Sequence, residues 1–128
     1  MKRIRVLQVD DNDDARTLLS IILKTEAGFE EVGSRSDAEG LEEVIRETAP
    51  DVLLIDLSMN GRDPIEAIRD VREAFPELRI VVLSGSRDPV LLERARKAGA
   101  SQLAMKALDY NETLAAIRGE SQQGAPRR

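Results

Sequence analysis

The chain contains no histidine and no cysteine, and both absences limit the chemistry that it can perform. Without an imidazole it cannot contain a Ser-His-Asp triad, a histidine general base or a histidine-containing zinc site. Without a thiol it cannot form a disulfide bond or use a thiolate nucleophile. Any reaction must therefore use carboxylates, hydroxyls and amines, and carboxylates favour a hard cation such as Mg²⁺.

Excess basic charge and long apolar runs are also missing. The net charge is −5, from 24 acidic and 19 basic residues, so we expect no direct nucleic-acid binding by this domain. No apolar stretch approaches twenty residues and no signal-peptide cleavage pattern follows the start, so we expect no membrane segment. Cytoplasm is the default expectation for location.

The 128 residues suit one domain, in which strand-like runs alternate five times with helical patterns. The predicted strands are 4–9, 31–34, 52–55, 80–83 and 103–105. The runs 52–55 and 80–83 are apolar at every position, as strands covered on both faces require. The pattern predicts an α/β fold with five helices and a doubly wound five-stranded parallel sheet. We expect one domain over residues 1–119, and a flexible tail or the start of a linker over 120–128.

Short capping motifs predict where the helices begin. Asp63 and Asp88 each precede a proline, and we expect both to cap a helix. Two capping boxes are also predicted, Ser36 with Glu39 for the second helix and Asp109 with Glu112 for the last. The first helix is predicted over residues 15–26, with an apolar face formed by Leu18, Leu19, Ile22 and Leu23.

Polar residues follow four of the predicted strands directly. In a doubly wound sheet, ligands bind beyond the carboxyl ends of the strands, where the strand order reverses. If the strand order is 2-1-3-4-5, the first and third strands are neighbours, and the acids after them converge on one crevice. The residues after the strands are Asp10 and Asp11, Asp56, Ser84 and Lys106.

Three carboxylates in one crevice repel one another and raise their pKa values, and a divalent cation removes that conflict. The same cation would hold a phosphate, while Lys106 supplies an ammonium and Ser84 a hydroxyl. These groups suit transfer of a phosphoryl group onto a carboxylate. Each residue alone has an ordinary explanation, since an Asp after a strand is often a turn residue. The set is specific, whereas Asp13 and Asp14 fit first-turn helix acids better.

Over residues 3 to 119 the chain resembles the receiver family of two-component response regulators, which has a flavodoxin-like fold with sheet order 2-1-3-4-5. The matching passages are VLQVDDNDDAR, PDVLLIDLSMNGRDPIEAIRDVRE, IVVLSGSRDP and KAGASQLAMKA. The resemblance implies that Asp56 accepts the phosphoryl group, and that Ser84 and Lys106 bind its oxygens. It implies Mg²⁺ as cofactor, bound by Asp11, Asp56 and the backbone carbonyl of Ser58, with Asp10 acting through water.

The sequence departs from the family pattern at four positions. Asn60 replaces a usual Pro, and Pro64 replaces a frequent Gly. Ala107 follows the lysine in place of a cis-Pro, and a non-proline bond prefers trans. Leu103 occupies the position of the switch aromatic, which puts the usual coupling in doubt. DLSMNGRDPIEAIR and a lysine without Pro resemble receivers that precede LuxR-type helix-turn-helix domains, so the chain is either a stand-alone receiver or part of a longer protein.

Three functions remain open. The first is a phosphorylated receiver that catalyses its own phosphorylation and dephosphorylation, with a sensor histidine kinase or phosphotransfer protein as donor. The donor would dock near Arg16 and Ser20, predicted to face solvent, and the turn at Ala107. The second is a degenerate receiver acting as a phosphorylation-independent adaptor. The third, a flavodoxin-like FMN carrier, is disfavoured by acids in its phosphate loop and by the scarcity of aromatics. A homodimer is also considered.

Overall fold

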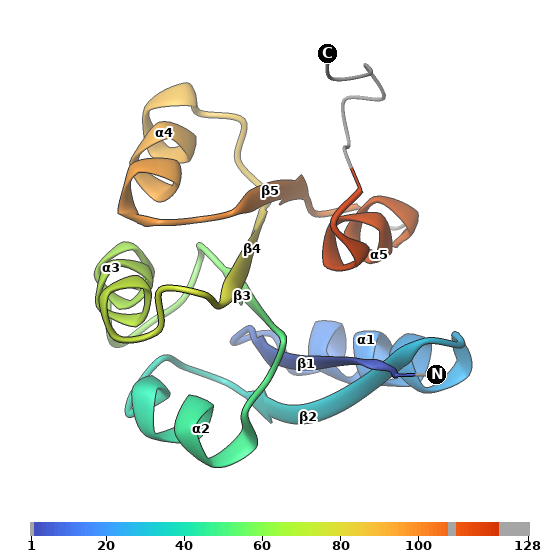
Figure 1. The fold of residues 1–128 in the computed structure, drawn as a ribbon. Coiled ribbons are helices and arrows are strands. Elements are labelled where there is room, and N and C mark those ends of the chain that lie inside the picture. Colours follow the sequence, from blue (N-terminus) through green and yellow to red (C-terminus); the bar gives the residue numbers. More distant parts are fainter. Residues whose placement is uncertain (1, 108–109, 121–128) are drawn as a thin grey trace.

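The computed structural model describes residues 2–107 and 110–120, and it shows a five-stranded parallel sheet with helices on both faces (Figure 1). The strands lie in the order β2-β1-β3-β4-β5, and every neighbouring pair is parallel, as predicted. The strands are β1 (Ile4–Val9), β2 (Phe29–Arg35), β3 (Val52–Asp56), β4 (Arg79–Ser84) and β5 (Gln102–Met105).

The helices of the described residues divide into two groups, one on each face of the sheet. They are α1 (Asp13–Thr25), α2 (Leu41–Thr48), α3 (Pro64–Ala74), α4 (Pro89–Ala98) and α5 (Asn111–Arg118). Helices α2, α3 and α4 bury their apolar sides in one core, and α1 and α5 bury theirs in another (Figure 1). Neither α1 nor any other helix among the described residues is long and apolar enough to cross a membrane.

Strands β3 and β4 lie at the centre of the sheet, and burial explains their continuous apolar sequences. All five residues of β3 are buried, and in β4 only Arg79 is partly exposed. Each buried Val, Leu or Ile contributes roughly 1.5–3 kcal/mol relative to an exposed one. Strand β2 is longer than the predicted 31–34, because its pairing with β1 already begins opposite Ile4, at Phe29.

The aspartate caps are confirmed, whereas the capping box of α2 was wrong. The Asp63 carboxylate accepts from the backbone N–H of Ile65 at 3.0 Å, and Asp88 does the same for α4. Helix α2 begins after Gly40, which lies in the left-handed region and has no side chain to cap with. Glu39 instead accepts from the backbone N–H of Arg62 at 3.0 Å, so its carboxylate serves a tertiary contact.

The first and last helices differ from their predicted starts. Helix α1 is capped by Asn12 and carries Asp13 and Asp14 in its first turn, as expected for first-turn acids. For α5, the predicted cap Asp109 lies outside the described residues. The carboxylate of its predicted partner, Glu112, accepts from the backbone N–H of Met105 at 3.2 Å and so fastens α5 to β5.

The predicted apolar face of α1 was partly wrong. Leu19 and Leu23 are buried as expected, but Leu18 is 46% exposed and its neighbour Ile21 is 54% exposed. The buried side of α1 is therefore narrower than the run of leucines indicates. The sheet surface under α1 includes polar residues of β1 and β2, and the helix turns two apolar side chains outward.

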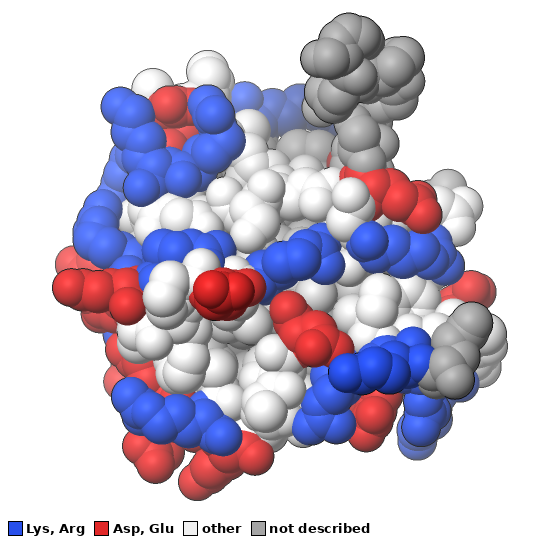
Figure 2. All heavy atoms as spheres, viewed as in Figure 1, with Lys and Arg blue, Asp and Glu red and all other residues white. Residues whose placement is uncertain are grey.

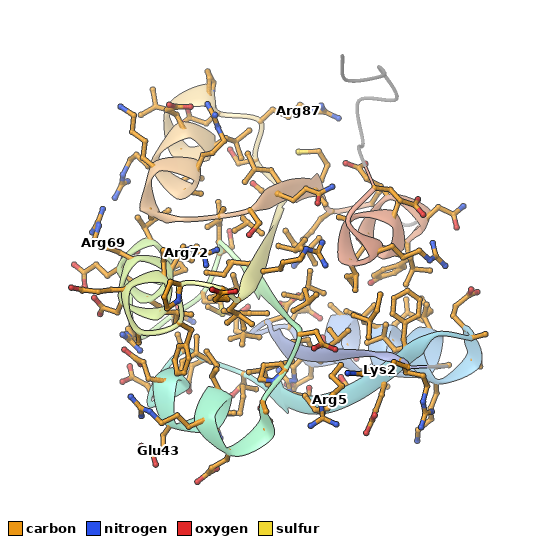
Figure 3. The ribbon with its side chains drawn as sticks, viewed as in Figure 1. Lys2, Arg5, Glu43, Arg69, Arg72 and Arg87 are labelled. Atoms are coloured by element: carbon orange, nitrogen blue, oxygen red, sulfur yellow. The ribbon has the colours of Figure 1, made fainter. Side chains whose placement is uncertain are left out.

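Three arginines bind backbone carbonyls at the carboxyl-terminal ends of helices. Arg5 donates to the carbonyls of Thr48 and Ala49 at the end of α2, and Arg79 donates to those of Ala116 and Ile117 in α5. Arg72 donates to four carbonyls and one hydroxyl, those of Phe75, Pro76, Leu78, Gly99 and Ser101. These bonds satisfy carbonyls that the helices and the adjoining turns leave without intrahelical partners. Figure 3 labels Arg5 on β1 and Arg72 on α3.

The face in Figure 2 carries both charge signs. A row of basic side chains crosses its middle, and acidic side chains lie above and below the row. Several of the arginines of the structure already serve as helix caps, as Arg72 and Arg79 do. This face is therefore not a uniformly positive surface, and the prediction that the domain does not bind nucleic acid stands as a prediction.

Candidate functional site

The predicted site residues meet at the carboxyl ends of the central strands. Asp10 directly follows β1, Asp56 and Ser84 are the last residues of β3 and β4, and Lys106 directly follows β5. Asp10, Asp56 and Ser84 are almost fully buried, with 5%, 2% and 1% of their surface exposed. The parallel pairing of β1 with β3 and of β3 with β4 brings these ends together, as the sequence predicted.

Lys106 forms ion pairs with two of the carboxylates. Its Nζ lies 3.1 Å from Oδ2 of Asp10 and 3.3 Å from Oδ2 of Asp56. Partial burial works against the charge on Lys106, but the two carboxylates outweigh it and raise the pKa of its ammonium. Lys106 therefore stays charged at neutral pH and sits where an anion on Asp56 would contact it.

The surroundings of Asp56 affect the pKa of its carboxyl in opposite directions. Burial raises the pKa of the Asp56 carboxyl, and the nearby Asp10 carboxylate raises it further. Lys106 and the backbone of Ser58 act in the opposite direction, and they do not fully compensate. A carboxylate that is buried, flanked by a like charge and only partly compensated is a typical signature of a functional site.

The acidic cluster fits a divalent cation. Ligand oxygens of Asp10, Asp11 and Asp56 all lie within 4.8 Å of one another, and Asp11 is exposed to solvent while the other two are buried. Oδ1 of Asp56 is buried and has no hydrogen-bond partner among the described residues. An unpartnered buried carboxylate oxygen is costly, and a hard cation bound by oxygen ligands would supply the missing partner.

Ser58 lies in the loop between β3 and α3, two residues after Asp56, and it is exposed. The nearby backbone of Ser58 acts to lower the pKa of Asp56, which places this part of the loop close to the carboxylate. The loop begins with a bond from the Leu57 N–H to the carbonyl of Leu83, 3.1 Å long, which ties it to the end of β4. The carbonyl of Ser58 as a fourth metal ligand remains a prediction.

Ser84 sits in a tight turn with Ser86. Its hydroxyl donates to the carbonyl of Ser86 at 2.9 Å and accepts from the N–H of the same residue at 3.0 Å. The carbonyl of Ser84 also accepts from the backbone N–H of Lys106, at 2.9 Å, so the ends of β4 and β5 stay joined. The Ser84 side chain must therefore exchange local bonds before it can bind a phosphoryl oxygen.

Leu103 and Ala107, which differ from the usual family residues, are both among the described residues. Leu103 is partly buried and packs against the core on the side of α2, α3 and α4. The described residues contain no cis peptide bond, so the Lys106–Ala107 bond is trans, as expected without proline. The chain holds its lysine in place by strand pairing and ion pairs.

The expectation that Arg16 and Ser20 face solvent was only partly right, because both residues are partly buried. The Arg16 guanidinium donates to the carbonyl of Asp10 at 2.8 Å and pairs with Asp13 at 2.6 Å. The Ser20 hydroxyl donates to Glu31 at 3.0 Å, underneath the helix. Polar groups on the sheet and in the β1–α1 turn bind these two side chains, although Arg16 also pairs with the exposed Asp13.

Sequence reasoning missed Gln8, a buried residue inside β1. Its amide donates to the Arg16 carbonyl, the Ser20 hydroxyl and the Glu31 carboxylate. The signal was available, since a glutamine in an otherwise apolar strand needs buried partners. Gln8 also lines a cavity of about 390 Å³ that opens beside the acidic site, together with Asp10, Ala15, Leu19, Leu83, Lys106, Ala107, Tyr110 and Thr113.

Comparison with known proteins gives a family match over most of the chain. Residues 6–118 match the model of the response regulator receiver domain. The transcriptional regulatory protein DegU of Brevibacillus brevis is 31% identical over 123 residues, covering 96% of this chain and 52% of DegU. LiaR of Bacillus subtilis (strain 168) is 34% identical over 125 residues, covering 97% of this chain and 58% of LiaR. The chain thus spans a little over half the length of these relatives.

Solved structures show the same fold. A two-component response regulator of the LuxR family from Aurantimonas sp. SI85-9A1 superimposes with a TM-score of 0.83 at 28% identity, over 93% of this chain and 88% of that one. The signal receiver domain of a NarL response regulator from Mycobacterium tuberculosis superimposes with a TM-score of 0.83 at 25% identity, over 94% of this chain and 100% of that one. The family match, the relatives and the fold agree, and the chain belongs to the receiver-domain family of two-component response regulators.

Proposed function

We propose that this receiver domain accepts a phosphoryl group on Asp56 in a Mg²⁺-dependent step and changes its binding to a downstream protein when it does so. The observation that carries the proposal is the unpartnered Oδ1 of Asp56, buried beside two further acids and a lysine. The donor would be a sensor histidine kinase or a phosphotransfer protein, because this chain has no histidine of its own. The proposed location is the cytoplasm.

In the proposed reaction, a carboxylate oxygen of Asp56 forms the new O–P bond as the P–N bond of a phosphohistidine breaks. The donor imidazole leaves and takes up a proton. Asp10, Asp11, Asp56 and the Ser58 carbonyl would hold Mg²⁺, which supplies charge neutralisation and orients the phosphoryl oxygens. Lys106 would remain beside Asp56 and pair with the transferred group, and Ser84 would leave its turn with Ser86 to donate to it.

The relatives indicate the general class of the downstream partner. DegU and LiaR are named as transcriptional regulatory proteins, and this chain matches roughly half of each. We propose that phosphorylation acts on an attached or separate output protein, and that the receiver itself makes no contact with nucleic acid. The acidic net charge of −5 supports this division of labour.

Intact mass measured after incubation with Mg²⁺ and acetyl phosphate tests the proposal. We expect one phosphoryl adduct on the wild-type chain, and none on Asp56→Asn or in a sample without Mg²⁺. Asp14→Asn is a matched control, because Asp14 is an exposed acid in the first turn of α1. It should retain the adduct, which excludes a general effect of removing one carboxylate.

A phosphorylation-independent adaptor is the second candidate, because Leu103 and Ala107 replace residues that the family uses to transmit the switch. If the folded wild-type chain binds Mg²⁺ but gains no adduct from acetyl phosphate or from a cognate kinase, the adaptor function replaces the first proposal. An adduct that persists in Asp56→Asn would instead move the phosphorylation site to another residue.

A further inference from the structure

The loop between β3 and α3, residues 57–63, carries Ser58 past the acidic cluster and must hold its backbone in one place if it is to bind a cation. Two features make it adaptable. Asn60 stands where the family usually has Pro, so the restriction that a proline ring imposes is missing. Gly61 has a φ of +83°, in the region that glycine enters without strain.

Arg62 fastens the far end of this loop to two helices. Its guanidinium forms a bidentate pair with Glu42 of α2, with N···O distances of 2.8 and 2.9 Å. It also donates to Asp70 of α3 at 2.8 Å and to the carbonyl of Ala38 at 3.0 Å. The Arg62 side chain is 18% exposed, so this network is partly shielded from water and from salt.

The backbone of the same residue is also held. The N–H of Arg62 donates to the Glu39 carboxylate at 3.0 Å, and a Cβ on Gly61 would lie 3.3 Å from that carboxylate. Glu39 therefore sits closely against the turn of the loop. The other end is tied by the Leu57 N–H to the Leu83 carbonyl. The segment that contains Ser58 is thus attached at both ends, to β4 through Leu57 and to α2 through Arg62.

We propose that Arg62 is a positioning residue for the Mg²⁺ site, which holds the 57–63 loop against α2 and so keeps the Ser58 carbonyl in place for the cation. The inference rests on the proposed function. Arg62 does not touch the acidic cluster and acts through the backbone between itself and Ser58. Contacts that orient a metal ligand without binding the metal typically change metal affinity by 10- to 100-fold when removed.

Electrostatics alone predicts the opposite sign, which makes the inference testable. Arg62 carries a positive charge, so removing it makes the surroundings of the acidic cluster more negative and by electrostatics alone should tighten Mg²⁺ binding. Loss of positioning should weaken it. Arg5→Ala is a charge-matched control, because Arg5 also binds α2, but at the carboxyl-terminal end of the helix, through the Thr48 and Ala49 carbonyls (Figure 3).

The experiment is a Mg²⁺ titration of the full chain without any phosphoryl donor, followed through backbone amide shifts in NMR. We expect the dissociation constant for Mg²⁺ to rise about tenfold in Arg62→Ala and to stay within about twofold of wild type in Arg5→Ala. Arg62→Lys keeps the charge but loses the bidentate fork, so it should show a smaller rise.

Unchanged or tighter Mg²⁺ binding in Arg62→Ala would overturn the inference. An equal loss of Mg²⁺ affinity in Arg5→Ala would overturn it as well. If Arg62→Ala does not fold, Arg62→Lys decides the question by the same measurement, because it keeps the positive charge and loses only the bidentate pair with Glu42. The wild-type arm separates this inference from the function on which it rests. A wild-type chain that binds no Mg²⁺ would overturn both, whereas a wild-type chain that binds Mg²⁺ with unaffected variants would overturn the inference alone.

Discussion

Arg72→Ala is expected to lower the free energy of unfolding by about 3 kcal/mol, the largest effect that we predict for a single side chain outside the cores. The guanidinium donates to the Leu78 carbonyl at 2.7 Å and to the Gly99 carbonyl at 2.8 Å, and further bonds reach Phe75 and Pro76. Removing it leaves carbonyls at the ends of α3 and α4 without a charged donor, and some of them are shielded from water.

Chemical denaturation by urea measures this loss, and Arg69→Ala is the matched control. Arg69 lies one turn earlier on α3, is exposed and makes no hydrogen bond or ion pair within residues 2–107 and 110–120 (Figure 3). Its replacement should change the free energy of unfolding by less than about 0.5 kcal/mol. Equal effects of the two substitutions would show that the charge of α3, and not the network of Arg72, sets the stability.

Asp56→Asn is expected to raise the free energy of unfolding by about 1 kcal/mol at neutral pH in the absence of divalent cations. The reason is the cost of the charged carboxylate. Burial raises the pKa of Asp56 above the ordinary value of 3.8, so the charged carboxylate costs more free energy in the folded state than in the unfolded state. An amide avoids that cost, and Lys106 keeps its ion pair with Asp10 at 3.1 Å.

The pH dependence of stability gives a second measure of the cost of the charged Asp56 carboxylate. The stabilising contribution of protonated Asp56 is fully present below pH 3.8 and is lost as the pH rises through the raised pKa of the folded state. The advantage of Asp56→Asn over wild type should therefore grow from about pH 4 upward and then level off. Mg²⁺ should reduce it, because the cation binds folded wild type more tightly than the variant.

Thermal unfolding of both chains at several pH values, with and without Mg²⁺, measures these differences. Asp14→Asn serves again as the control, since an exposed acid has no burial cost to relieve. A variant less stable than wild type above pH 5 would show that the Lys106 ion pair with Asp56 outweighs the burial of the carboxylate. In that case the site would favour a charged Asp56 even without a cation.

The sheet and the positions of the site residues could be predicted because local patterns determine them. The fully apolar runs 52–55 and 80–83 predict a covered parallel sheet, and its topology then brings Asp10, Asp56 and Lys106 to one end. Short-range rules also predicted Asp63 and Asp88 as caps, because the bonded N–H groups lie two residues away. Such signals need no knowledge of how the rest of the chain packs.

The missed features depend on contacts between residues far apart in the sequence. Glu39 fits a capping motif locally, but the N–H of Arg62, 23 residues away, takes its carboxylate. Gln8 and Glu31 both form hydrogen bonds with Ser20, so this side chain, predicted to face solvent, binds the sheet instead. Polar side chains have several possible partners, and the tertiary structure decides among them. Apolar periodicity depends less on distant partners, although it too failed at Leu18, which is 46% exposed.

The cavity beside Lys106 is lined by Tyr110, which is the one tyrosine of a chain without tryptophan. Ultraviolet emission from the protein therefore arises almost entirely from a single ring at the edge of the acidic pocket. We expect that a ligand entering this cavity would change the intrinsic fluorescence of the unlabelled chain. The scarcity of aromatics thus gives this domain a built-in optical reporter at its site, with little background from elsewhere in the fold.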